Sequence, residues 1–184
     1  MENPAPATPD DKDWTWTTRG ACAECGFDPD AITNDAIARA ISARIDDAAR
    51  TLGQPGAVRR PDATTWSPVE YGRHMADVCE VMTRRLDAIL GSEFMADFES
   101  WDGEAAAVDG RYWQSTPDAT VALLTTRGAE AAEAFARPQG RDWNKRGRRG
   151  DGVEFTARTL GLYLLHELTH HARDAAIGVR AQHT

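Results

Sequence analysis

Residues 66–90 read WSPVEYGRHMADVCEVMTRRLDAIL, and this stretch contains the clearest helix start in the chain. Ser67 can cap the first backbone N–H groups, Pro68 suits the first helical position, and Glu70 completes a capping box. Apolar residues then recur three or four positions apart as far as Gly91, namely Tyr71, Met75, Val78, Met82, Leu86 and Ile89. This spacing predicts an amphipathic helix that buries one face.

Three further segments share this helical periodicity. The spacing predicts helices over residues 33–52, 116–137 and 156–178, and Pro138 ends the second of these. We find no alternating pattern of β-branched residues that predicts a strand. The expected fold is therefore all-α, a four-helix bundle with a long crossover segment.

A long crossover segment, residues 92–115, separates the second and third predicted helices. It carries three large aromatic residues, Trp101, Tyr112 and Trp113. Short helical turns and an aromatic cover over one end of the bundle are expected there.

Composition limits the class of protein. The chain has 184 residues, which suits one domain with a real hydrophobic core. Its net charge of -8 argues against a general binder of nucleic acid or anionic membranes. No apolar run approaches the roughly 20 residues that span a bilayer. Three cysteines without an export signal predict a reducing, cytoplasmic location.

The N-terminus is acidic and rich in proline, so residues 1–20 are predicted to be a disordered lead-in. Residues 21–184 are predicted to form the single four-helix bundle domain. His183 lies in the C-terminal tail and is set aside.

Histidines are concentrated on two predicted helices. His166 and His170 are four residues apart, so they differ by only about 40° in direction and project from one helix face. His74 lies near the core-facing stripe of the helix that begins at Ser67, where its nitrogens need polar partners or a metal. We predict that His74, His166 and His170 bind one divalent ion. Three imidazoles with an open position suit zinc, with nickel or iron as alternatives.

A second register is open on the same helix. Glu167 and His171 also form an i, i+4 pair, rotated from the first by about 100°. Leu164, Leu168 and Ala175 lie on either side of the His166/His170 stripe, which favours the first pair. Solvated histidines without a metal are the simpler alternative.

Two motifs resemble a known family. Residues 66–74, WSPVEYGRH, open the helix that carries His74, and His166-x-x-x-His170-His171 lies in the last helix. With their order and separation over residues 31–176, they resemble the DinB-like metal-binding four-helix bundles. These include mycothiol-dependent maleylpyruvate isomerases and bacillithiol transferases. In that family one histidine of the second helix and two of the last hold a divalent metal, which implies the same three ligands here.

The resemblance also implies an activity. The mycothiol-dependent isomerases use a glutamate and a histidine in the last helix, so the two-histidine register resembles the transferase branch more closely. It implies a metal-dependent enzyme that uses or transfers a low-molecular-weight thiol, a mycothiol-type S-transferase or isomerase acting on an electrophile. The expected partners are thus a small-molecule thiol and an electrophile, with a homodimer as a further option. A hydrolase using metal-bound water and a non-catalytic metal-binding bundle are the alternatives.

Two other motifs stand outside the histidine pattern. Cys22-x-x-Cys25 precedes the first helix and could be half of a zinc site or a redox pair. No second such pair follows, so we expect it to be structural or incidental and dispensable for the histidine site. Residues 141–149, RDWNKRGRR, predict a solvated basic loop, in which Arg146 or Arg148 could bind a carboxylate of the thiol.

A cavity is expected if the protein is an enzyme. Tyr163, one turn before His166, and the Trp101/Trp113 segment are its predicted lining.

Overall fold

The computed structural model describes residues 4–8 and 12–182. Residues 1–3 and 9–11 of the predicted lead-in, and His183, lie outside the described part. Four long helices form the bundle: α1 (Ile37–Leu52), α2 (Pro68–Gly91), α4 (Pro117–Ala136) and α5 (Ala157–Ala181). The predicted four-helix bundle is therefore confirmed, and each helix begins and ends close to its predicted bounds.

Side-chain caps explain where the helices begin. The Ser67 hydroxyl accepts the Glu70 backbone N–H at 3.3 Å, and the Glu70 carboxylate accepts the Ser67 N–H at 2.8 Å. The Thr116 hydroxyl accepts the Ala119 N–H at the start of α4, and Thr156 forms a second capping box, with Thr159, at the start of α5. Each cap satisfies backbone donors that the first helical turn leaves unpaired.

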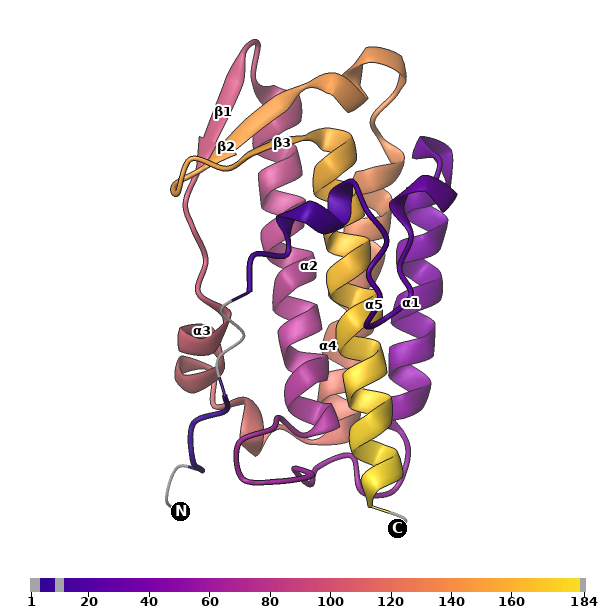
Figure 1. The fold of residues 1–184 in the computed structure, drawn as a ribbon, viewed down its shortest axis with the longest axis vertical. Helices are drawn as coiled ribbons and strands as arrows, with labels where there is room; N and C mark the ends of the chain where they lie inside the picture. Colours follow the sequence, from indigo (N-terminus) through magenta and orange to yellow (C-terminus); the bar gives the residue numbers. More distant parts are fainter. Residues whose placement is uncertain (1–3, 9–11, 183–184) are drawn as a thin grey trace.

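The bundle has an unusual order of helices. α2 packs against α4 and α5, and α1 packs against the same two helices. Figure 1 shows α2 and α4 running in one direction and α1 and α5 in the other. Because α2 and α4 are parallel neighbours, the chain must return along the whole bundle between them, which is what residues 92–116 do.

A small sheet was not predicted. The crossover contains β1 (Met95–Phe98), α3 (Gly103–Asp109) and a short 3-10 helix, η4 (Tyr112–Gln114). β1 pairs in parallel with β2 (Arg146–Arg149), which pairs antiparallel with β3 (Glu154–Thr156). The expectation of no strands was wrong, since these strands are only three or four residues long and β1 pairs with β2 across about fifty residues of sequence.

The sheet closes one end of the bundle. It lies beside the end of α2 and the start of α5 (Figure 1). A Cβ at Gly147 would come within 2.7 Å of Ile89 and 2.5 Å of Phe98, so only glycine allows this approach. Within the described residues, no helix is long and apolar enough to cross a membrane.

The N-terminal segment packs along the bundle before α1 begins. It contains the 3-10 helices η1 (Thr15–Thr18), η2 (Pro29–Ala31) and η3 (Asn34–Ala36). Trp14 and Thr17 are buried, and η1 contacts α5. The segment crosses the face formed by α2 and α5 (Figure 1). Packing therefore begins inside the stretch that the sequence assigns to a disordered lead-in.

Candidate metal centres

Helix α5 presents two pairs of potential metal ligands in adjacent registers. His166 and His170 form one pair, and Glu167 and His171 form the other. Consecutive helical residues are rotated by about 100°, so the two pairs face different neighbours. The structure groups the first pair with two cysteines of the N-terminal segment and the second pair with His74 of α2.

The cluster that includes Glu167 and His171, which we call the His74 group, consists of these two residues and His74. One donor atom from each lies within 4.8 Å of the others. Glu167 Oε2 is 3.8 Å from His74 Nε2 and 3.4 Å from His171 Nε2, so both imidazoles face one carboxylate oxygen. Two imidazoles and a carboxylate are a donor set that zinc and other divalent transition metals accept.

Aromatic rings fix the orientation of these imidazoles. The centroid of the His74 ring is 5.2 Å from that of Trp66 and 5.5 Å from that of Trp101. His171 stacks on Tyr71 with 5.4 Å between centroids. Among the described residues neither nitrogen of His74 has a hydrogen-bond partner, although His74 is buried. A buried imidazole without partners is costly, and a metal ion would satisfy it.

The electrostatics favour an ionised carboxylate at this cluster. Burial alone would raise the pKa of Glu167, but His166, His171 and His74 together lower it well below its ordinary value. Burial also opposes the charge on His171, but Asp174 and Glu167 raise its pKa to about 9. Burial lowers the pKa of His74, which favours the neutral ring that a metal ligand needs, whereas His171 would have to release its proton on binding an ion.

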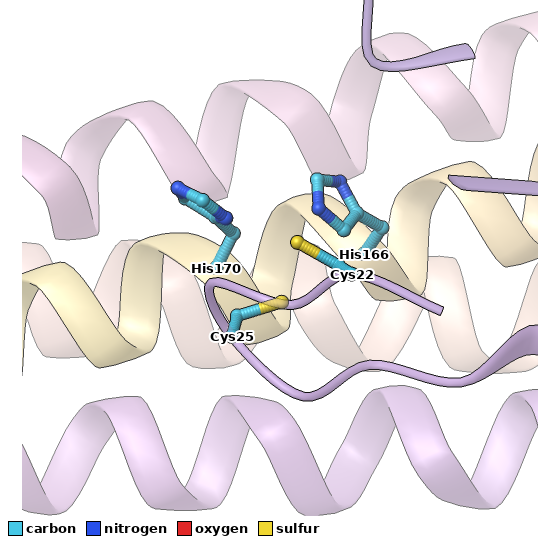
Figure 2. Close-up of side chains that lie close together, drawn as sticks. All are labelled: Cys22, Cys25, His166 and His170. Atoms are coloured by element: carbon cyan, nitrogen blue, oxygen red, sulfur yellow. The ribbon is translucent and has the colours of Figure 1, made fainter. Parts of the chain in front are cut away.

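The second cluster, which we call the Cys22 group, consists of Cys22, Cys25, His166 and His170. Its four donor atoms also lie within 4.8 Å of one another. Figure 2 shows the cysteines on the N-terminal loop facing the two histidines of α5.

The predicted triad is thus divided between two clusters. His74 meets Glu167 and His171, whereas His166 and His170 face away from His74 towards Cys22 and Cys25. The register that places a carboxylate and an imidazole opposite His74 is the second one considered from the sequence. The N-terminal segment lies over the His166/His170 face, and the apolar neighbours in the sequence do not indicate which segment covers that face.

A cavity of about 560 Å³ opens beside both clusters. Its wall includes the His74 group, the two histidines of the Cys22 group, and Trp14 and Lys12 of the N-terminal segment. Arg85, Arg149 and Tyr163 line another part of it. The cavity is large enough for a small organic substrate.

The predicted lining residues are partly confirmed. Tyr163 and Trp101 line the cavity, and Trp113 is not among the described residues that do so. Arg146 and Arg148 lie instead on exposed β2, where they pair with Glu154 at 3.4 Å and with Asp97 at 2.9 Å. Alternation along the strand explains this difference, because the side chain that reaches the cavity from this stretch is that of Arg149.

Arg85 is a cavity residue that the sequence analysis missed. It is buried on α2, and its guanidinium donates to the Glu99 carbonyl at 3.0 Å. Burial lowers its pKa to about 10, so it is still charged at neutral pH. Within the described part of the chain no carboxylate pairs with it. Arg85 lies three residues after Met82 and seven after Val78, in line with the apolar stripe, and this position was the available signal.

Together, the bundle and its histidine clusters define a helical-bundle protein with candidate metal sites. The DinB superfamily model matches residues 37–175, so the chain belongs to the DinB superfamily. This confirms the resemblance drawn from residues 66–74 and the last helix.

A solved structure has the same fold. It is YfiT from Bacillus subtilis, described as a probable metal-dependent hydrolase with an unusual four-helix bundle topology. The TM-score is 0.70 at 15% identity, and the match covers 82% of this chain and 87% of YfiT. At this identity the likeness establishes the fold alone. Comparison with curated protein sequences gave no match.

Proposed function

We propose that this protein is a metal-dependent hydrolase whose ion is held by His74, Glu167 and His171. The observation that carries the proposal is the convergence of these three donors at the wall of a cavity of about 560 Å³. Three protein ligands leave positions open for water and substrate, as catalytic zinc sites do. YfiT, which shares the fold, is described as a probable metal-dependent hydrolase, and this supports the choice of reaction.

An ion bound there would supply Lewis acidity, which activates water and polarises a carbonyl or phosphoryl oxygen. The protein supplies the binding geometry. Arg85 places a positive charge in the cavity without a described carboxylate partner, so it can bind an anionic group of the substrate. Burial raises the pKa of Tyr163, so its hydroxyl stays protonated and can donate a hydrogen bond.

The aromatic residues limit the access of water. Trp66 and Trp101 both pack against the His74 ring, and Tyr71 stacks on His171. These contacts hold the ligands in place and present an apolar surface to the substrate. The preferred substrate class is therefore a small ester, amide or phosphoester that carries an anionic group.

The test is hydrolysis by metal-loaded protein of a panel of carboxylate-bearing esters, amides and phosphoesters. Activity should disappear with a chelator, return with added metal, and be absent from His171→Ala. Arg146→Ala is the matched control, because Arg146 lies on exposed β2 and should leave the rate unchanged. Activity that persists in the His74→Ala/His171→Ala protein would refute the proposed site.

Use of a thiol is a second candidate, favoured by one observation. The residues that face His74 are a glutamate and a histidine of the last helix. The mycothiol-dependent isomerases, which this chain resembles, use the same pair of residue types. The two-histidine pattern in the last helix was the difference that argued against an isomerase, and the Glu167/His171 register does not have it. A mycothiol-type S-transferase or isomerase would bind a thiol sulfur as a ligand. Cobalt-substituted protein would then gain thiolate charge-transfer absorption on addition of a thiol, most clearly in the Cys22→Ser/Cys25→Ser background.

A further inference from the structure

The Cys22–Cys25 turn is shaped to present two sulfur atoms to α5. The Gly26 N–H donates to the Cys22 carbonyl at 2.8 Å, and the Cys22 N–H donates to the Phe27 carbonyl at 2.8 Å. Gly26 has a φ of +76°, a conformation that favours glycine and lets the chain reverse directly after Cys25. The result is a tight loop with both thiols on its inner side (Figure 2).

The histidines opposite this turn are buried without hydrogen bonds. His166 is 1% exposed, and among the described residues neither of its nitrogens has a hydrogen-bond partner. The Nδ1 of His170 is also buried and unpartnered. Around them lie Trp14, whose ring centroid is 5.0 Å from that of His166 and 4.8 Å from that of His170, and Phe27. Carboxylates also face these rings, with Glu167 3.9 Å from His166 Nδ1 and Asp174 3.6 Å from His170 Nε2, but both are beyond hydrogen-bond distance. The buried imidazole nitrogens therefore remain costly without a further partner.

We propose that Cys22, Cys25, His166 and His170 form a second metal site, a closed tetrahedral zinc site separate from the His74 group. Two thiolates and two imidazoles are a donor set of structural zinc sites, in which four protein ligands leave no open position. The four donor atoms lie within 4.8 Å of one another, and in a tetrahedral zinc site they would be roughly 3.3–3.8 Å apart. A small inward movement of the side chains would complete the coordination.

The two thiols of the loop differ in their local electrostatics. Burial opposes ionisation of Cys22, but the backbone N–H groups of Cys25 and Glu24 and the His166 ring lower the pKa of its thiol. Burial raises the pKa of Cys25 to about 11, so this second thiol would release its proton only on binding the ion.

The role of this site is to fix the N-terminal segment. The cysteines belong to that segment and the histidines to α5, so one ion would join parts of the chain more than a hundred residues apart. The same segment contributes Trp14 and Lys12 to the cavity wall. The second ion would therefore hold part of the wall of the first site in place without taking part in its chemistry.

The test is the zinc content of the full chain after loading and dialysis, with cobalt substitution as a spectroscopic readout. Wild-type protein should bind about two ions and show thiolate-to-cobalt absorption without any added thiol. Cys22→Ser/Cys25→Ser should lose one ion and this absorption. His74→Ala/His171→Ala should lose one ion and keep the absorption, so failure of the proposed function and failure of this site are distinguishable.

Cys79→Ala is the matched control and should keep both ions, because Cys79 belongs to neither cluster. If the double serine variant does not fold, the test uses wild-type protein and measures how far zinc protects its thiols from chemical modification. Zinc should slow modification of Cys22 and Cys25 by a thiol reagent at least tenfold, and a chelator should reverse the effect. One ion per chain that survives the double serine change, equal reactivity with and without zinc, or a disulfide that persists beside zinc would overturn the proposal.

Discussion

Gly103, the first residue of α3, lies against the imidazole of His74. A Cβ at this position would be 2.8 Å from His74 Cε1 and 3.2 Å from Nδ1. Ordinary contacts begin at 3.4 Å, so in Gly103→Ala the ring must move away by roughly half an ångström. The ring is packed against Trp66 and Trp101, so it cannot relax freely in its present place.

This displacement is large for a metal ligand. Ligand distances in metal sites hold to within about 0.2 Å, and disturbances of the shell around a ligand typically weaken metal binding by about 10–100-fold. We therefore expect Gly103→Ala to weaken binding at the His74 group by about 10–100-fold, or about 1.4–2.8 kcal/mol. Overall stability should not fall, because alanine favours helix over glycine by roughly 0.5–1 kcal/mol.

The assay is a competitive zinc titration against a chromophoric chelator, with the cobalt–thiolate absorption reporting the Cys22 group separately. Gly91→Ala is the control, since a Cβ there meets nothing within 4 Å and Gly91 likewise lies at a helix end, that of α2. Only the His74 group should weaken in Gly103→Ala. Wild-type affinity at both sites would show that His74 is not a ligand and would refute the reasoning.

Three further predictions concern single contacts. Arg85→Met should raise KM for an anionic substrate at least tenfold and leave kcat for a neutral analogue unchanged, as measured by steady-state kinetics. Tyr112→Phe removes the buried hydrogen bond to Asp77 and should cost about 1–2 kcal/mol in urea unfolding. Arg149 lowers the pKa of Asp151 to about 2, so the pair stabilises the fold above the ordinary value of 3.8 and loses this effect as pH falls towards 2. Asp151→Asn should therefore flatten the acid side of the stability profile, and an unchanged profile would show that the pair is too exposed to matter.

The bundle was predictable because its signals are local. Ser67 and Glu70 are three residues apart, and the structure shows the reciprocal capping bonds that this spacing predicts. Thr116 and Thr156 likewise cap the helices that were expected to begin there. Such signals need no knowledge of the rest of the chain.

The strands were not predictable for the opposite reason. β2 is the tetrapeptide Arg146–Arg149, whose charged composition indicates a solvated loop. It becomes a strand because it pairs with Met95–Phe98, which precedes α4 in the sequence, whereas β2 follows α4. Tertiary pairing determines such a short strand, and local propensity contributes little.

The two candidate metal clusters could be predicted only in part. Sequence spacing identified both i, i+4 pairs on α5 but could not show which pair faces His74. That depends on how α5 is rotated against α2, and on the N-terminal segment that covers the remaining face. Cys22 and Cys25 lie in a segment without helical periodicity. The sequence therefore could not show that this segment packs on α5 and places the two cysteines beside His166 and His170.

The two clusters share their outer carboxylates, which explains how one helix can carry both. Asp174 Oδ2 is 3.6 Å from His170 Nε2 and 3.6 Å from His171 Nδ1, so one carboxylate faces a ring of each group. His171 faces Glu167 with its Nε2 and Asp174 with its Nδ1, and carboxylates of this kind orient metal-bound imidazoles. Glu167 acts similarly, with Oε2 towards the His74 group and Oε1 3.9 Å from His166 Nδ1. An ion bound in either register would therefore help to order the side chains of the other, because Glu167 and Asp174 each face imidazoles of both groups.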